Sequence, residues 1–387
     1  MSDLCPLPFV SLEADSLGNC KVCCLSRDVI PNIDLRKNTL SEAFHSPYMQ
    51  ELRSAFLRGE KPEGCSRCWD EEATGRKSKR MNSWTRLRHM IKDVKMESST
   101  DGQLLFLDLK LGNICNLKCR ICGSFSSSKW AAEEIAMYKN NQVARENLER
   151  GRWPRESHAF WEDLEGMLAN VRYMEFTGGE PFLIDEHFEL LQRAVDMGVA
   201  GQIEIHYNTN TTTVPQAGLD LWPHFKLVEI ALSIDDIGPR FEYQRHGAIW
   251  SKTQDNLKTF LALKNINDNI KLQLCLTVNS QNFYYIDEVL AWVPSQGFDY
   301  VHINLLHDAW YFSIRNLTRE AKDLIQDKYA EYSGPYADEV QKLLQFMWSS
   351  EPTDGTKLVQ VLRSSDVLRD QKFSDHHPEM ARAIGYE

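Results

Sequence analysis

Cysteine is concentrated in the first third of the chain, and one group has a spacing that suits an iron–sulfur cluster. Nine of the ten cysteines precede residue 123, and Cys115, Cys119 and Cys122 form a CxxxCxxC run. Thiolates are the usual ligands of iron–sulfur clusters, and a cubane cluster normally takes four of them. Three cysteines would leave one iron able to bind a small molecule. Structural zinc is the alternative, but zinc takes four ligands, commonly from CxxC pairs.

A predicted α/β core positions this cysteine run. Leucines alternate through residues 104–111, which predicts a strand just before Cys115. Five further strands are expected at 172–177, 202–208, 226–235, 271–278 and 299–306. Helical patterns separate them, so we expect a parallel sheet that right-handed crossovers curl toward a partial (β/α)6 barrel. This core spans 100–310, between a cysteine-rich domain at 1–92 and a helical C-terminal extension at 311–387.

Polar and glycine-rich segments follow several of these strands, where the functional loops of such folds lie. The second strand leads into a TGGEP segment, in which glycines permit close approach of a ligand and a carboxylate suits an ammonium group. A Gly-Pro turn, an Asn-rich turn, a surface ion pair and a buried strand end are the structural alternatives for these positions. The candidates are Gly178, Gly179, Glu180, Pro181, Asn208, Asn210, Ser233, Asp235, Arg245 and Val278.

The cysteine run together with the GGEP segment resembles the radical S-adenosylmethionine (radical SAM) superfamily. The resemblance implies a [4Fe–4S] cluster on Cys115, Cys119 and Cys122, with S-adenosylmethionine on the fourth iron. It implies that GGEP holds the amino group of the cofactor, and that Asn208 and Asn210 line its ribose. By the same resemblance, Ser233, Asp235 and Arg245 are expected to contact the carboxylate and the ribose of S-adenosylmethionine, and Val278 its adenine. Ile121 occupies a position where the family often has an aromatic residue.

Six cysteines in the first 70 residues form a second set. Gly18 and Cys23 make a Gly-x4-Cys pattern, and Cys65 and Cys68 make a CxxC. This segment resembles the twitch and SPASM modules that bind an auxiliary [4Fe–4S] cluster. The implied ligands are Cys5, Cys23, Cys65 and Cys68, with Cys24 as the substitute for Cys23 and Cys20 spare. Zinc on the same four thiolates stays open as the alternative.

The resemblance implies an enzyme that cleaves S-adenosylmethionine reductively and oxidises a peptide or protein side chain. Two alternatives remain: a small-molecule substrate such as a sugar, nucleotide or antibiotic intermediate, and a non-catalytic zinc or cluster protein. The expected partner is a flavodoxin- or ferredoxin-type electron donor. The sequence indicates no catalytic acid or base.

The bulk properties narrow the setting. The 387 residues carry a formal charge of −11, from 44 basic and 55 acidic side chains, which disfavours nucleic acid as a partner of the whole chain. There is no apolar run long enough to cross a bilayer and no pattern of a secretory signal at the start of the sequence. We therefore expect a cytoplasmic protein without a membrane partner, in which thiols stay reduced.

Overall fold

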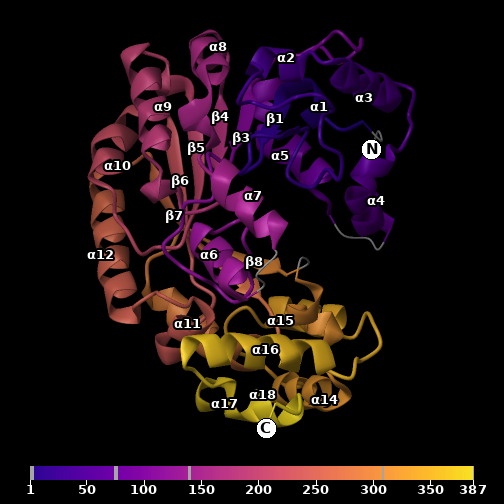
Figure 1. The fold of residues 1–387 in the computed structure, drawn as a ribbon, viewed down its shortest axis with the longest axis vertical. Coiled ribbons are helices and arrows are strands. Elements are labelled where there is room, and N and C mark those ends of the chain that lie inside the picture. The colour runs from indigo at the N-terminus through magenta and orange to yellow at the C-terminus, as the bar shows by residue number, and fades with distance from the viewer. Residues whose placement is uncertain (1–3, 74–76, 138–140, 307–308, 387) are drawn as a thin grey trace. The chain divides into compact units, whose positions relative to one another are not determined.

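The computed structural model describes residues 4–73, 77–137, 141–306 and 309–386 (Figure 1). The chain forms two compact units, each assembled from several segments. The first unit combines Met1–Cys115, Ser124–Tyr207 and Pro215–Glu229, and the second combines Asn116–Gly123, Asn208–Val214 and Ile230–Glu387.

The strands of the first unit follow the order β2-β1-β3-β4-β5. Their bounds are Ser11–Ala14 for β1, Cys20–Lys21 for β2, Phe106–Leu109 for β3, Tyr173–Phe176 for β4 and Glu204–Thr209 for β5. Parallel pairing joins β1, β3, β4 and β5, whereas β2 is antiparallel to β1. The sequence predicted β3, β4 and β5 but neither β1 nor β2, so the cysteine-rich segment contributes a strand beside the first predicted one.

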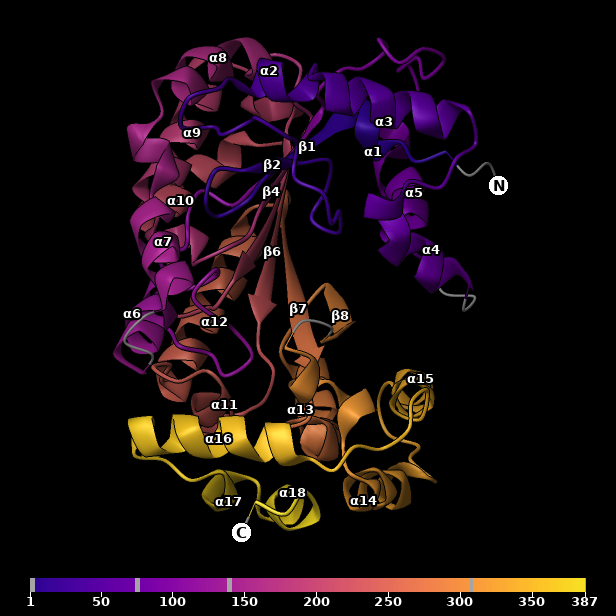
Figure 2. The same ribbon diagram turned by 45° about the vertical axis from the view of Figure 1, so that its right-hand side comes forward.

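Opposite faces of these strands have opposite character. On one face, Phe176 and Tyr207 pack on His187 with ring centroids 4.5 and 5.2 Å away. Helices α8 (His158–Leu168), α9 (Asp185–Asp196) and α10 (Gln216–Leu221) cover this apolar face, and α5 (Lys79–Ile91) lies on the other side (Figures 1 and 2). Ser78 caps α5 by accepting a 3.3 Å hydrogen bond from the Met81 N–H, which starts the helix at Lys79.

The remaining helices of the first unit occupy the cysteine-rich segment and the connection from β3 to β4. They are α1 (Leu7–Val10), α2 (Leu40–Phe44), α3 (Pro47–Leu57), α4 (Ser66–Ala73), α6 (Ser128–Met137) and α7 (Gln142–Arg150).

The second unit carries the later predicted strands and the predicted helical extension. Strands β6 (Leu227–Ser233), β7 (Ile270–Val278) and β8 (Tyr300–Leu305) lie in that order, and β7 and β8 are parallel. The first three residues of β6, up to Glu229, belong to the first unit. The α/β class with a mostly parallel sheet is thereby confirmed. Its helices are α11 (Gly238–Gln244), α12 (Trp250–Ile266), α13 (Ile286–Trp292), α14 (Arg319–Tyr329), α15 (Ala337–Met347), α16 (Thr356–Arg369), α17 (Phe373–His376) and α18 (Pro378–Ala383). Within the described ranges, no helix has the length and apolar character that crossing a membrane requires.

A buried histidine makes the first unit sensitive to acid. The Trp222 indole donates a 3.1 Å hydrogen bond to the Tyr207 oxygen, which also forms a 2.9 Å hydrogen bond with His187 Nε2. Burial lowers the pKa of His187 to about 3. Because this folded-state pKa lies below the ordinary value of 6.5, the group's stabilising contribution is complete above that value and is lost as the pH falls.

We expect His187→Gln to lose less stability on acidification than the wild type. From pH 8 to pH 5, the wild type should lose about 2 kcal/mol of unfolding free energy through His187 alone. The variant should not show this loss, because glutamine does not titrate. Urea unfolding at the two pH values measures this difference. His158→Gln on α8, an exposed position, is the control and should keep the wild-type slope. An unchanged pH slope in His187→Gln would contradict the assignment.

Candidate active site

The GGEP turn after β4 packs against the chain that leads into the first cysteine of the CxxxCxxC run. Gly178 and Gly179 have φ values of +74° and +57°. A Cβ at Gly179 would lie 2.5 Å from the Ile114 carbonyl oxygen, so only glycine permits this approach. The Glu180 N–H donates a 2.7 Å hydrogen bond to the same carbonyl. The backbone immediately before Cys115 is therefore fixed by the GGEP turn.

The two ends of this contact are anchored locally. Glu180 is fully buried, and its carboxylate accepts a 3.2 Å hydrogen bond from the Phe182 N–H at the start of the short helix Pro181–Leu183. The Cys115 N–H donates to Ser128 Oγ, 3.3 Å away in the first turn of α6. Backbone and side-chain groups thus hold the Cys115 segment from both sides.

In the second unit, the rest of the cysteine loop pairs with the segment around Arg245. The Lys118 N–H donates to the His246 carbonyl at 2.9 Å, and the Arg120 N–H donates to the Gln244 carbonyl at 2.8 Å. These two bonds bracket Cys119, which is buried. The turn continues with a 3.0 Å bond from the Cys122 N–H to the Cys119 carbonyl, and the Cys122 side chain is exposed.

Arg245 lies between a buried carboxylate and a cysteine. Its Nη2 donates to Asp235 Oδ2 at 2.6 Å, and its Nη1 lies 3.9 Å from Cys119 Sγ. Arg245 Nε is buried and has no hydrogen-bond partner among the described residues. Asp235 Oδ1 accepts a 2.9 Å bond from the Thr277 N–H, which ties the end of β6 to β7. The hydrogen bond with Cys122 and the charge of Arg245 lower the pKa of Cys119, which favours the thiolate that binds metal.

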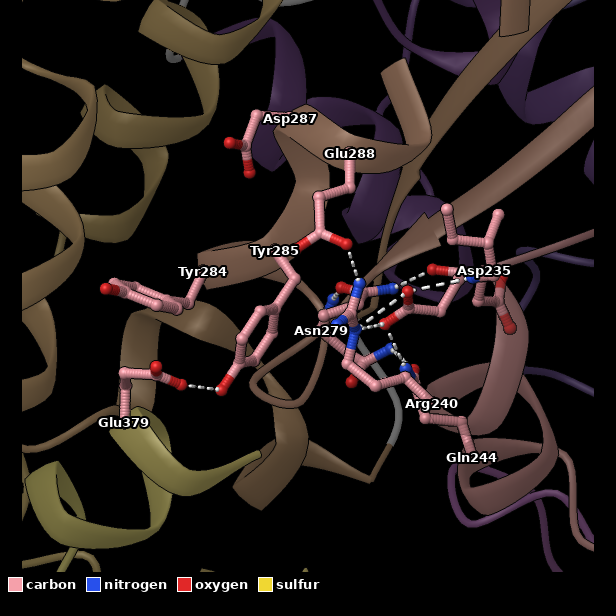
Figure 3. Close-up of polar contacts among 12 residues, drawn as sticks. Asp235, Arg240, Gln244, Asn279, Tyr284, Tyr285, Asp287, Glu288 and Glu379 are labelled. Carbon is pink, nitrogen blue, oxygen red and sulfur yellow. Dashed lines mark hydrogen bonds and ion pairs between the residues drawn. The ribbon is translucent and has the colours of Figure 1, made fainter. Parts of the chain in front are cut away.

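A network of hydrogen bonds behind Asp235 holds the segment that follows β6 in place (Figure 3). Asn282 Nδ2 donates to the carbonyl oxygens of Asp235 and Thr277, both at 2.9 Å. The neighbouring Asp236 accepts from Gln244 at 2.9 Å and from Arg240 at 3.1 Å, and burial raises the pKa of Asp236 to about 7. Sequence reasoning missed Asp236 and Asn282, because their part in positioning the loop depends on tertiary contacts.

The other predicted cofactor residues lie at strand ends, as expected. Asn210 Nδ2 donates to Asn116 Oδ1 at 2.9 Å, which brings the end of β5 to the cysteine loop. Asn208 Nδ2 lies 3.8 Å from Cys275 Sγ. Ile121 in the cysteine loop and Ser233 at the end of β6 are partly exposed, and Val278 is fully buried at the end of β7. Their contacts with a cofactor stay predictions.

The four predicted auxiliary ligands line one cavity in the first unit. Cys5, Cys23, Cys65 and Cys68 border a cavity of about 20 Å³, together with mainly apolar side chains. Cys24 does not line it, because its Sγ accepts a 2.9 Å hydrogen bond from Lys79 Nζ instead. The arrangement therefore favours Cys23 over Cys24, a choice that adjacent cysteines in the sequence left open.

The chemistry of this cavity suits a positively charged occupant. Burial raises the pKa of Cys5, and the neighbouring Cys23, Cys65 and Cys68 raise it further. Burial also raises the pKa of Cys23 to about 11. Four such thiols cannot all ionise in an apolar space unless metal compensates their charge.

Across residues 4–73, 77–137, 141–306 and 309–386, however, no three His, Cys, Asp or Glu side chains form an arrangement that could hold a metal ion. The four cysteines share a cavity without converging on a single ion position.

Comparison with known proteins gives only distant likenesses. The sequence matches no family model and no curated protein. Among solved structures, anSMEcpe with bound AdoMet is 18% identical, with a TM-score of 0.39 over 69% of this chain and 62% of that one. Streptococcus suis SuiB bound to S-adenosylmethionine is 13% identical, with a TM-score of 0.36 over 75% and 59%. TYW1 with a lysine-pyruvate adduct is 12% identical, with a TM-score of 0.32 over 59% and 72%.

The chain spans only about 62% of the length of the first of these structures. Likenesses of this size carry no argument about activity, substrate or partner.

We expect the four cavity cysteines, and not Cys24, to hold metal. Serine variants of Cys5, Cys23, Cys65 and Cys68 should each lose roughly four of roughly eight irons after anaerobic reconstitution, because each breaks a closed ligand set. Cys24→Ser should keep them. Iron and zinc per chain, measured by elemental analysis, check this. Loss of one zinc instead of iron would make the site structural, and iron loss in Cys24→Ser alone would contradict the ligand set.

Proposed function

We propose that this protein is a radical SAM enzyme that oxidatively modifies a peptide or protein side chain. The observation that carries the proposal is the backbone contact of the GGEP turn with Ile114, next to Cys115. An ordinary Gly-Pro turn without a role in cofactor binding would have no reason to contact the three-cysteine loop. The position of Arg245 beside Cys119 supports the same assignment from the second unit.

The residues present fit the implied cofactor. Cys115, Cys119 and Cys122 would hold the cluster; their joint ligation is proposed from their spacing in one loop. The buried Nε of Arg245, which has no hydrogen-bond partner among the described residues, is a donor that suits a carboxylate, and Asp235 fixes the orientation of its guanidinium. When bound, the cluster and S-adenosylmethionine together supply a 5′-deoxyadenosyl radical that takes a hydrogen atom from the substrate. The role of the protein is then to orient these groups and exclude competing reactions.

The N-terminal cavity supports net oxidation as the outcome. Four cysteine ligands would close an auxiliary cluster to substrate, which leaves electron transfer or structural support as its roles. An electron acceptor near the substrate allows a substrate radical to lose its electron. A flavodoxin- or ferredoxin-type protein in the reducing cytoplasm is the proposed source of electrons for the first cluster.

We expect formation of 5′-deoxyadenosine to depend on the three-cysteine loop. The reconstituted protein, reduced with dithionite and given S-adenosylmethionine, should release 5′-deoxyadenosine, measured by chromatography. Replacement of Cys115, Cys119 and Cys122 together by alanine should abolish this product, while the iron of the N-terminal site remains. Cys20→Ala is the control, because Cys20 does not line the auxiliary cavity. Intact clusters that never cleave the cofactor would instead favour a non-catalytic binding protein.

A further inference from the structure

A row of ionisable side chains crosses the α5-facing side of the strands in the first unit. The register pairs Glu13 on β1 with Asp108 on β3, Asp108 with Glu175 on β4, and Glu175 with His206 on β5. Directly paired residues of neighbouring strands project to the same face of a sheet. Glu229 on β6 extends the row through a 2.7 Å hydrogen bond with His206 Nδ1. We call these five residues the ionisable row.

Two lysines contact the near end of the row. Lys110 makes ion pairs with Glu13 and, at 3.6 Å, with Asp108 Oδ1. Lys79, at the start of α5, lies 3.9 Å from Asp108 Oδ2 and 4.0 Å from Glu175 Oε2. Buried carboxylates are costly unless they are paired, so these lysines partly offset the cost.

Arg86 on α5 contacts the far end of the row, where it lies 3.6 Å from Glu229.

Two oxygens of the row lack hydrogen-bond donors. Glu13 Oε2 and Asp108 Oδ1 are buried without a hydrogen-bond partner in the described part of the chain, and each residue is only 2% exposed. An unsatisfied buried acceptor is destabilising, and more so when it is charged. Solvent nevertheless reaches the row, because the Glu175 and Lys79 side chains are 20% and 21% exposed. A bound group with N–H donors would satisfy both oxygens.

We propose that the ionisable row binds a protonated primary amine of a peptide substrate. The ammonium group carries three N–H donors, which the two oxygens lack, and its positive charge suits carboxylates. The site adjoins the GGEP turn, since a Cβ at Gly178 would lie 2.8 Å from Lys110 Cβ. This inference rests on the proposed function and adds the chemical class of its substrate.

Three synthetic pentapeptides test the inference on the reconstituted full-length protein. The first has a central lysine and blocked ends, the second has norleucine and a free amino terminus, and the third has norleucine and blocked ends. Norleucine keeps the aliphatic chain of lysine without its ammonium group. Calorimetry should show the third peptide binding about tenfold more weakly or worse than the first or the second. The first two distinguish a side-chain amine from a terminal amine.

Conservative variants locate the binding in the row. Asp108→Asn and Glu13→Gln should weaken binding of the preferred amine peptide by about tenfold, and should leave the blocked norleucine peptide unchanged. Glu204→Gln is the matched control, because Glu204 lies on the same face of β5 but pairs with Lys226 and His89 outside the row. Thermal unfolding verifies that each variant is folded.

Three outcomes would overturn the inference: no binding of any peptide, equal binding of the blocked norleucine peptide, or unchanged amine affinity in both Asp108→Asn and Glu13→Gln. Release of 5′-deoxyadenosine without peptide, measured on the same samples, tests the proposed function separately. A protein that cleaves the cofactor but ignores the amine would keep the enzyme class and lose the substrate class.

Discussion

The hydrogen bond from the Glu180 N–H to the Ile114 carbonyl is the contact on which the arrangement of the first unit's candidate site depends. It joins the loops that follow two adjacent strands, β3 and β4, which are parallel and in register. Loops after neighbouring parallel strands leave the sheet at the same edge, so a short bond can connect them. Gly179 makes the contact possible, since any side chain there would collide with the carbonyl oxygen. A change of register between β3 and β4 would remove the contact and release the segment before Cys115.

In the second unit, the arrangement of the candidate site depends on the side chain of Asp235. Its two carboxylate oxygens have different partners, the Thr277 N–H on β7 and the Arg245 guanidinium. The side chain therefore joins two strands and also orients the cation beside Cys119. Because Asp235 is 2% exposed, its charge would be costly without both partners. The surrounding network of Asn282, Asp236 and Gln244 limits where this loop can move.

Alternation of apolar residues was sufficient to predict the strands from β3 to β8 and the motifs at their ends. It missed β1, because the alternation there is confined to the four residues Ser11–Ala14, whereas around β3 it runs through residues 104–111. It also gave no sign of the ionisable row. Asp108 and Glu175 alternate with apolar neighbours, and this pattern ordinarily indicates a face open to water. Only the position of α5 over that face shows that these carboxylates are largely enclosed (Figure 2).

The choice between Cys23 and Cys24 shows why local sequence could not define the auxiliary ligand set. The two residues are adjacent, yet one faces the cavity and the other faces Lys79. Lys79 also meets Asp108 and Glu175, so one cation serves both the cysteine-rich segment and the parallel strands. The cysteine-rich segment further supplies β1 and Glu13 to the same sheet. It therefore shares one compact unit with the GGEP turn.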